Sequence, residues 1–495
     1  MADNLEKLVE TQLIINGEWR PSLSGQKYEV RNPANPEEIV GFAARANADD
    51  VNLAVEAAHK AFPEWSSLSY HERAEYLRRV DKELVADKED LQFRTRLFTR
   101  EHGKILKESG MEMSRLGDRF LLCAGYAERL SQDEELQGPP FDTIITRQAR
   151  GVALLIVPWN WPLSILGAKL PQALITGNTV VIKTAYESPL APALTIKKMV
   201  EVLPPGVINL VTGPSSEIGD ALLTHPLARK INFTGGIESG RHIMAMAAKT
   251  LKPVTLELGG NDPAIILEDA DLSQESLQRM AMGTFLTAGQ VCMALKRIYV
   301  HTSRNKELVE GFTGIVSKHL VGNGLNPDVT MGPLNNEDQL RFVQGLVADA
   351  RQKGATVNEV GQIEDKELFK RGYFHRPTII TDVDPETEVV KKEQFGPVVP
   401  IIPFERIEDA IRMANDTEYG LCSSVWTTDK ERALQIARQL EAGYTYLNAH
   451  GPMAQDSRAP FGGFKESGIG RALGFEGVLE FLEYHSISSA PGWLF

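Results

Sequence analysis

Cys292 and Glu257 are the two residues whose chemistry combines most directly. Cys292 ends the run Gly289-Gln290-Val291-Cys292, and Glu257 lies in Leu256-Glu257-Leu258, directly before Gly259-Gly260. A thiolate can add to a carbonyl carbon and hold the product as a thioester, and a carboxylate can activate the water that releases it. The pair therefore indicates covalent carbonyl chemistry with a cysteine nucleophile and a glutamate base.

Both residues also have simpler interpretations. A free cysteine is most often a buried apolar thiol, and we expect this of Cys123 and Cys422. A glutamate can lie on the solvated face of a strand, but a carboxylate within an apolar strand is costly unless it is paired or used. The glycine pair after Glu257 brings backbone close to a ligand, which favours a functional role for this residue. For Cys292 the motif alone leaves both interpretations open.

Asn160 lies in the segment Pro158-Trp159-Asn160-Trp161-Pro162, which follows an apolar run at residues 152–157. As a turn residue it needs no further explanation. As an amide donor at the end of a strand it could bind an oxyanion and contribute roughly a hundredfold or more to the rate. The two prolines also indicate that the uncharged residues 151–168 form a strand, a turn and a helix, and not a membrane span.

Between residues 152 and 258 the chain alternates strand-like and helix-like runs. The expected strands cover residues 152–157, 179–182, 207–211, 230–233 and 254–258. The helices expected between them cover residues 162–174, 190–202, 218–223 and 240–248. This alternation predicts a parallel, doubly wound α/β sheet, and such sheets bind ligands beyond the carboxyl ends of their strands.

The regions on either side of this segment give weaker patterns. Residues 1–130 are expected to be mostly helical, apart from a small hairpin at residues 14–19, and residues 132–150 to form a β-ribbon. A second α/β region is expected to begin near residue 260. Its strands are expected at residues 297–300, 377–380 and 398–402, and its helices at residues 337–353 and 430–440.

Composition excludes several classes of protein. The 495 residues suffice for two to four domains, and the net charge of -13 argues against binding to nucleic acid or to an anionic membrane. The three cysteines are far apart and odd in number, so no disulfide framework is expected. No zinc-ligand spacing occurs. Residues 1–10 are charged and lack the apolar core of a signal peptide, so we expect a cytoplasmic protein.

The evidence for a nucleotide site is indirect, because no GxGxxG motif follows a strand. The segment Phe233-Thr234-Gly235-Gly236-Ile237 follows an expected strand and opens a helix, so its free N–H groups could face a phosphate. Lys183 ends another strand and is a candidate for ribose hydroxyls, although a lysine in this position is more often solvated.

In these motifs the chain resembles the NAD(P)+-dependent aldehyde dehydrogenase family, over nearly all of its length. Seven blocks carry the resemblance: Pro158-Trp159-Asn160-Trp161-Pro162, Ile182-Lys183-Thr184, Phe233-Thr234-Gly235, Leu256-Glu257-Leu258-Gly259-Gly260, Gly289-Gln290-Val291-Cys292, Glu393-Gln394-Phe395-Gly396-Pro397 and residues 460–468. It is similar in particular to a poorly characterised bacterial and fungal subfamily, at residues 260–262, 290–297 and 448–451.

The resemblance implies an α/β fold of the aldehyde dehydrogenase type, with a Rossmann-type parallel-sheet cofactor domain, an α/β catalytic domain and a bridging β-hairpin. The cofactor-binding domain would comprise residues 1–130 and 150–259, and the catalytic domain residues 260–466. Residues 131–149 and 480–495 would form an oligomerisation element. The implied partners are a small-molecule aldehyde and further copies of the chain, in a homodimer or homotetramer.

The resemblance also implies roles for single residues. Cys292 would be the nucleophile and Glu257 the base, with the Asn160 amide and the Cys292 backbone N–H as an oxyanion hole. The cofactor would be NAD, with NADP not excluded. The residues implied to bind it are Trp159, Lys183, Gly236, Glu393 and Phe395. Among these, Lys183 and Glu393 would hold the ribose hydroxyls, Phe395 would lie beside the nicotinamide, and Gly236 would face the diphosphate.

Four positions depart from the family's usual residues. Thr287 replaces an asparagine, and Gly236 replaces a serine whose hydroxyl could bind phosphate. Tyr186 replaces a glutamate that repels a 2′-phosphate, which leaves NADP+ open, although Glu187 follows it. Ala472 replaces a glutamate, which puts a proton relay through that carboxylate in doubt.

The resemblance places mainly apolar residues in a substrate tunnel, which favours an aliphatic or aromatic aldehyde. These positions are Trp161, Ile165, Ala168, Val291, Met293, Gln455 and Phe461. Because none of them is an arginine or lysine, an anionic semialdehyde is less favoured. Two alternatives to acid formation stay open: a CoA-acylating dehydrogenase, against which Glu257 argues, and a non-enzymatic structural protein on the same fold.

Overall fold

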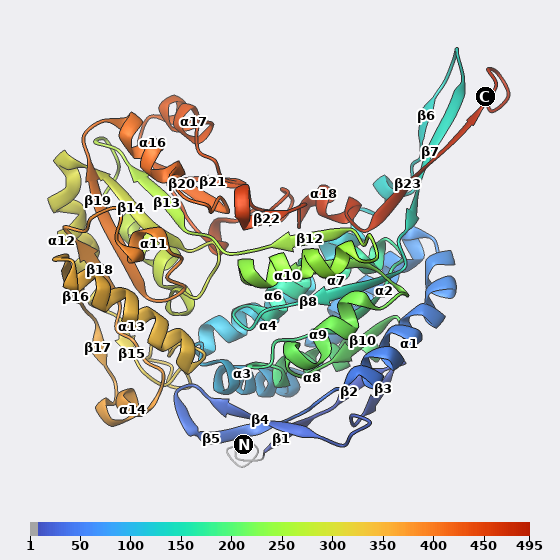
Figure 1. Cartoon of the computed structure of the whole chain (residues 1–495), viewed down its shortest axis with the longest axis horizontal. Coiled ribbons are helices and arrows are strands. Elements are labelled where there is room, and N and C mark those ends of the chain that lie inside the picture. Colours follow the sequence, from blue (N-terminus) through green and yellow to red (C-terminus); the bar gives the residue numbers. More distant parts are fainter. Residues whose placement is uncertain (1–7) are drawn as a thin grey trace.

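The computed structural model describes residues 8–495 and has two α/β bodies and a projecting arm (Figure 1). Residues 1–7 lie outside the described residues. They make up most of residues 1–10, the segment in which the sequence indicates no signal peptide. The first body is built on an eight-stranded sheet and the second on a seven-stranded sheet. Within residues 8–495, no helix is both long and apolar enough to cross a bilayer.

The first sheet has the strand order β22-β12-β11-β8-β9-β10-β2-β3, in which β22 is Gly468–Ile469. Its central strands are β8 (Val152–Ile156), β9 (Thr179–Lys183), β10 (Ile208–Val211), β11 (Ala228–Thr234) and β12 (Val254–Glu257). All four pairings among these strands are parallel, which confirms the prediction for this region. Because the carboxyl ends of parallel strands meet at one edge, the ends of β8, β9, β11 and β12 bring four predicted site segments together.

Helices cover both faces of this sheet: α6 (Pro162–Gly167), α7 (Leu170–Ile175), α8 (Leu190–Val200), α9 (Ser215–Thr224) and α10 (Ile237–Ala248). The single helix expected at residues 162–174 is wrong in one respect, since it is divided into α6 and α7. The reason is Pro171, which has no N–H to donate to the carbonyl of Gly167. The helix therefore stops and begins again at Leu170, with Ala168 and Lys169 at the junction.

The expectation of a mostly helical N-terminal region holds only from residue 48 onward. That part contains α1 (Ala48–Ser67), α2 (Tyr70–Val85), α3 (Lys88–His102), α4 (Leu106–Ala124) and α5 (Ala127–Leu130). Residues 9–44 instead form β1 (Val9–Thr11), β2 (Leu13–Ile15), β3 (Glu18–Arg20), β4 (Lys27–Asn32) and β5 (Asn35–Ala44). The predicted hairpin is β2-β3, which extends the first sheet.

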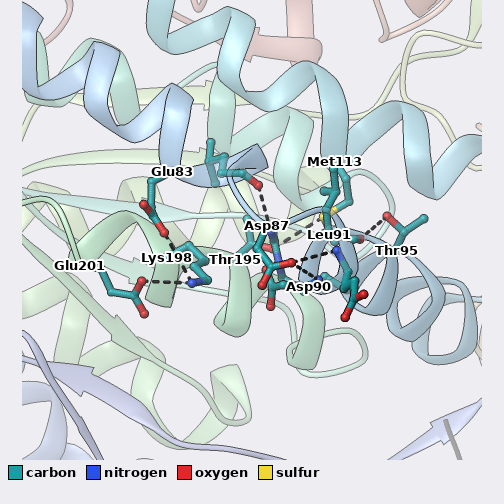
Figure 2. Close-up of polar contacts among 12 residues, drawn as sticks. Glu83, Asp87, Asp90, Leu91, Thr95, Met113, Thr195, Lys198 and Glu201 are labelled. Carbon is teal, nitrogen blue, oxygen red and sulfur yellow. Dashed lines mark hydrogen bonds and ion pairs between the residues drawn. The ribbon is translucent and has the colours of Figure 1, made fainter. Parts of the chain in front are cut away.

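Polar contacts fix the helices α2, α3, α4 and α8 against one another. Figure 2 shows Lys198 of α8 between Glu83 of α2, at 3.5 Å, and Glu201, at 3.2 Å. In the same view the hydroxyl of Thr195 lies 3.6 Å from the sulfur of Met113 on α4. The buried Arg94 of α3 donates to Thr195 as well. Helix α4, which reaches the candidate site, is therefore held along its length by its neighbours.

The second sheet has the strand order β16-β18-β19-β14-β13-β20-β21. Its strands are β13 (Asp262–Ile266), β14 (Leu295–His301), β16 (Thr356–Glu359), β18 (Thr378–Thr381), β19 (Val398–Phe404), β20 (Cys422–Trp426) and β21 (Tyr444–Leu447). Its helices include α11 (Gln274–Phe285), α12 (Asn305–Val316), α13 (Glu337–Gln352), α15 (Glu388–Lys391), α16 (Ile407–Asn415) and α17 (Lys430–Ala437). The expected strands correspond to β14, β18 and β19, and the expected helices to α13 and α17.

The arm is a three-stranded antiparallel sheet of β6 (Glu134–Leu136), β7 (Asp142–Ala149) and β23 (Leu482–Ser489). It projects away from both bodies, and the chain ends near its tip (Figure 1). The β-ribbon predicted for residues 132–150 thus also pairs with the C-terminal strand. Most side chains of β23 are exposed, including Tyr484 and Ile487.

Candidate active site

The two α/β bodies enclose a cavity of about 680 Å³, here called the larger cavity. It lies beyond the carboxyl ends of β8, β9 and β11, the position expected for ligands of such a sheet. Seven of the eight predicted site residues line it: Trp159, Asn160, Lys183, Gly236, Cys292, Glu393 and Phe395. Segments far apart in the sequence thus meet around one cavity.

A second cavity of about 120 Å³, here called the smaller cavity, is lined by Glu257, the eighth predicted residue. Asn160, Thr234 and Cys292 line both cavities. All seven positions expected in a substrate tunnel line the smaller one: Trp161, Ile165, Ala168, Val291, Met293, Gln455 and Phe461. Cys292 is only partly buried, and it lies where the two cavities meet.

A strained turn presents Cys292 to the cavities. Thr287 and Ala288 have φ values of 52° and 53°, in the left-handed region that side chains with a Cβ seldom adopt. Gly289 follows with φ 73°, and a Cβ there would lie 2.2 Å from the carbonyl oxygen of Gly396. The backbone N–H of Thr287 donates to the carboxylate of Glu108 at 2.7 Å. This buried contact holds the turn in place.

Asn160 is tied to the same turn. The side-chain Nδ2 of Asn160 donates to the backbone carbonyl oxygen of Gln290 at 2.9 Å. The backbone carbonyl oxygen of Asn160 accepts a hydrogen bond from Nζ of Lys104 at 2.9 Å. Gln290 in turn donates to the carbonyl oxygen of Thr287. The amide of Asn160 and the cysteine turn therefore form one hydrogen-bonded unit, with an amide donor next to the thiol.

Buried charges at and just before the start of α4 support this unit, and no sequence motif predicts them. Lys104 and Glu112 form an ion pair of 2.6 Å with both side chains inaccessible to solvent. The other oxygen of Glu112 accepts the N–H groups of Leu163 and Ser164 at 2.7 and 2.9 Å, at the start of α6. In the sequence these charges look like the solvated face of an amphipathic helix, so no motif distinguishes them.

Glu257 ends β12 with 8% of its side chain exposed. Burial raises the pKa of its carboxyl group, and the charges of Lys169 and Arg471 oppose this shift. One carboxylate oxygen, Oε1, has no hydrogen-bond partner among the described residues. Lys169, which the sequence did not reveal, is itself buried, donates to Asn232, and has its pKa lowered to about 8 by burial. A buried carboxylate with a raised pKa and a free oxygen is suited to accept a proton near neutral pH.

The environment of Cys292 disfavours the free thiolate. Burial raises the pKa of the thiol, and the negative charges of Glu257 and Glu393 raise it further. Only the thiolate is strongly nucleophilic, so the proton of Cys292 has to be removed as the sulfur attacks.

Two ionisable residues, Lys183 and Glu393, line the larger cavity. Lys183, at the end of β9, has its pKa lowered to about 8 by burial. Glu393 accepts the N–H of Gly260 at 3.2 Å, and burial raises its pKa to about 7, against the charge of Lys296. Both side chains carry polar groups of the kind that bind the hydroxyl groups of a ligand.

The glycine pair after Glu257 also has a steric reason, and Gly259 lines the larger cavity. A Cβ at Gly259 would lie 2.3 Å from a carboxylate oxygen of Glu393, and a Cβ at Gly260 would lie 2.4 Å from the carbonyl oxygen of Cys292. The pair therefore lets the second body approach the end of β12. It makes room for Glu393 and Cys292.

Aromatic rings and a helix end complete the larger cavity. Trp159 meets Phe395 edge to face at 5.4 Å, and Tyr186 stacks on Tyr28 at 4.2 Å. Gly236 precedes α10, and the place of its missing Cβ has no atom within 4 Å. Free N–H groups at the start of this helix can therefore approach a phosphate closely. The cavity, its hydroxyl-binding groups and this helix end fit a dinucleotide.

The smaller cavity contradicts one expectation from the sequence. Arg115 and Arg119 of α4 line it, whereas the expected lining contained no arginine. Both lie more than 40 residues before Asn160 in a charged helix, so nothing in the sequence placed them here. Ala472 also lines this cavity, so no carboxylate is present at that position.

Comparison with known proteins identifies the family. The family model described as "Aldehyde dehydrogenase family" matches residues 19–487. The chain belongs to the aldehyde dehydrogenase family. It is 36% identical to the succinate-semialdehyde dehydrogenase [NADP(+)] GabD of Escherichia coli K12, over 97% of this chain and 98% of that protein. It is also 36% identical to a glutarate-semialdehyde dehydrogenase of Pseudomonas aeruginosa, over 96% of this chain and 97% of that protein.

Solved structures agree with this assignment. Betaine aldehyde dehydrogenase of Staphylococcus aureus, in complex with NAD+, has a TM-score of 0.91 and 34% identity, and the match covers 97% of this chain and 94% of that one. The expected fold is thereby confirmed. The chain is an NAD(P)+-dependent aldehyde dehydrogenase, and the alternative of a non-enzymatic protein on the same fold is set aside.

Proposed function

We propose that this aldehyde dehydrogenase converts an aldehyde to its carboxylic acid through a covalent adduct on Cys292. The observation that carries the proposal is the position of Cys292 where the two cavities meet. The larger cavity holds the residues that suit a dinucleotide, and the smaller one holds Glu257 and a mainly apolar lining. A carbonyl group entering through the smaller cavity would reach the thiol from the side opposite the cofactor residues.

The first half of the reaction uses the thiol and the amide. Cys292 loses its proton to solvent, and its sulfur forms a bond to the carbonyl carbon, whose oxygen becomes negatively charged. The Asn160 amide and the Cys292 N–H stabilise this oxygen, an effect of roughly a hundredfold or more. When bound, the nicotinamide cofactor supplies the hydride acceptor, and the carbon is left as a thioester of Cys292.

The second half uses the carboxylate. Glu257 removes a proton from water, and the resulting hydroxide attacks the thioester carbon. The carbon–sulfur bond breaks, the thiolate of Cys292 leaves, and the carboxylic acid departs through the smaller cavity. Because the Oε1 atom of Glu257 has no hydrogen-bond partner within the described part of the chain, it can bind this water. Addition of CoA to the assay tests the acylating alternative, which predicts a CoA thioester as the product.

The cofactor roles are proposed as the resemblance implies them. Lys183 and Glu393 hold the hydroxyls of the riboses, Gly236 and the start of α10 hold the diphosphate, and Trp159 and Phe395 flank the nicotinamide. Among residues 8–495, Lys183 is the only cationic side chain that lines the larger cavity. A 2′-phosphate would find little positive charge there and would meet Glu187, so we propose NAD+ as the preferred cofactor.

This preference can be tested at Glu187. Replacing Glu187 with glutamine removes a negative charge from the lining of the larger cavity. The loss of repulsion between this charge and the 2′-phosphate, about 1 kcal/mol, should raise kcat/KM with NADP+ several-fold. The value of kcat/KM with NAD+ should stay nearly unchanged. Steady-state kinetics with both cofactors measure the ratio. Glu217→Gln, which changes a charge paired with Arg45 outside the lining, is the control. An equal rise for both cofactors would place Glu187 away from the 2′-position.

The domain roles and location are proposed on the same basis. The first body binds the cofactor, the second supplies the nucleophile, and the arm pairs subunits in a homodimer or homotetramer. Three free cysteines suit a reducing compartment, which supports a cytoplasmic location. The exposed apolar residues of β23, Tyr484 and Ile487, support the role of the arm, because such side chains seldom face water together.

A variant of the arm tests the oligomer. Tyr484→Asp together with Ile487→Asp places two charges on β23, so the mass measured by light scattering after size-exclusion chromatography should fall to that of a smaller species. Leu251→Asp changes a side chain that is 88% exposed on the first body, and should leave the mass unchanged. A wild-type enzyme that is monomeric at all concentrations would refute the assignment.

A further inference from the structure

Three side chains on one face of α4 line the smaller cavity. Met111, Arg115 and Arg119 are spaced four residues apart, and residues at this spacing lie above one another on a helix. Arg115 is exposed, whereas Arg119 is partly buried. The row therefore runs along the wall of the cavity and presents two guanidinium groups to the space that Cys292 also lines.

These two guanidinium groups lack a counter-ion. Among residues 8–495, neither forms an ion pair, and Nη1 of Arg115 is 3.6 Å from the sulfur of Met453, its one polar contact. Nη1 of Arg119 is buried without any hydrogen-bond partner. Asp118 acts on Arg119 from the same helix, but it is exposed and does not line the cavity.

Such an arrangement costs stability unless an anion completes it. Like charges four residues apart on a helix repel each other, and burial lowers the pKa of Arg119, as does the charge of Arg115. A buried donor without a partner is also unfavourable. A carboxylate between the two groups would relieve all three costs, because guanidinium and carboxylate form paired, charge-assisted hydrogen bonds.

The remaining lining sets the shape of the ligand. Most of the other side chains around the cavity are apolar, among them Trp161, Val291 and Phe461. The stem of Arg119 lies against Gly167, where a Cβ would come within 3.1 Å of its Cγ, and the adjacent Ala168 is also small. The cavity therefore offers a thiol, an apolar passage and a cationic wall.

We propose that Arg115 and Arg119 form an anion site that selects aldehydes carrying a carboxylate at the far end of a short aliphatic chain. The site rests on the proposed function, because the aldehyde end must reach Cys292. It reverses the preference inferred from the sequence, which did not place these arginines in the cavity. It also implies that aldehydes with a fixed positive charge are poor substrates.

Matched substrates of different charge test the site. We compare kcat/KM for succinic, glutaric and adipic semialdehyde with that for butanal, pentanal and hexanal, and for betaine aldehyde as a cation. In Arg115→Gln/Arg119→Gln, kcat/KM for the preferred semialdehyde should fall by about tenfold to a hundredfold, as expected for lost charge-assisted hydrogen bonds. Values for the neutral aldehydes should change less than about threefold, and betaine aldehyde should improve, as expected when a like charge is removed.

Two variants refine the result. Arg119→Lys keeps the charge but not the paired geometry, so its preference should lie between those of wild type and Arg119→Gln. Arg78→Gln removes a charge from the neighbouring helix α2, outside the cavity, and should leave the preference unchanged. Activity on the neutral aldehydes shows that each variant is folded.

A measurement without cofactor addresses the same site. Iodoacetate and iodoacetamide both alkylate a thiolate, forming a sulfur–carbon bond and releasing iodide, but only the first is an anion. The ratio of their rates at Cys292, followed by peptide mass spectrometry, should fall in Arg115→Gln/Arg119→Gln. Raising the salt concentration should lower the ratio in the wild type, since exposed charges are screened.

The outcomes separate the two proposals. If substitution of the arginines lowers kcat/KM equally for anionic and neutral aldehydes, or if the wild type shows no preference for the anion, the anion site is wrong while the dehydrogenase assignment stands. If no aldehyde of any charge is oxidised, the proposed function itself fails. In that case, an unchanged alkylation ratio in the double variant would refute the anion site separately.

Discussion

Cys292→Ala should abolish aldehyde oxidation while cofactor binding persists. Removing the sulfur removes the atom that forms the covalent adduct, and loss of a nucleophile typically lowers kcat by about 10⁴-fold or more. The residues proposed to hold the cofactor line the larger cavity independently of the Cys292 side chain. Steady-state NADH formation measures the loss, and titration calorimetry with NAD+ measures the retained binding.

Cys123, one of the other two cysteines, provides the control for Cys292→Ala. Cys123 is buried, and burial raises the pKa of its thiol to about 12, so it has neither access nor reactivity. Cys123→Ala should keep nearly full turnover. The mechanism is overturned if Cys292→Ala still oxidises aldehydes, or if Cys123→Ala loses turnover while it binds NAD+ and unfolds at the wild-type temperature.

The residues at strand ends could be predicted, because their position follows from the alternation of strands and helices. Lys183 and Glu257 each end an apolar run, and Gly236 opens the helix after another. A parallel sheet places such ends on one edge, so the sequence was sufficient to bring them together. Cys292 and Glu393 come from outside this sheet, and only the resemblance linked them to it.

The buried charged residues that hold the site in place could not be predicted. Lys104 directly precedes α4, and Glu108 and Glu112 lie in it. The charges of this segment are spread around the circumference of the helix, so the sequence does not show which face is buried. Arg115 and Arg119 were missed for the same reason. Apart from the hairpin β2-β3, the strands of residues 9–44 were missed. Strand β4 alternates buried and exposed residues, with charged side chains outward, and its polar composition hides the pattern.

Glu257→Gln should separate the two halves of the reaction. The amide cannot take a proton from water, so the thioester on Cys292 should form and then persist. Rapid-mixing experiments should show a burst approaching one NADH per active site, followed by a steady rate lowered by about a hundredfold or more, in the range that general base catalysis supplies. Mass spectrometry of the quenched enzyme should detect the acyl group on Cys292.

The dependence on pH gives a second signature. Burial raises the pKa of Glu257, and only its ionised form is a base, so the steady rate of the wild type should rise as pH increases through that raised pKa. In Glu257→Gln this rise should disappear from the steady phase. A dependence that remains in the burst phase would then report the Cys292 thiol, whose pKa is also raised.

A strong external nucleophile should restore turnover to the variant. Hydroxylamine attacks a thioester without help from a base, forms a hydroxamate and releases the thiolate of Cys292, so the steady rate of Glu257→Gln should increase with its concentration. Glu393→Gln is the contrasting variant, since it should weaken cofactor binding and gain nothing from hydroxylamine. If Glu257→Gln has the wild-type steady rate, or if it shows neither a burst nor rescue, the carboxylate does not activate the deacylating water.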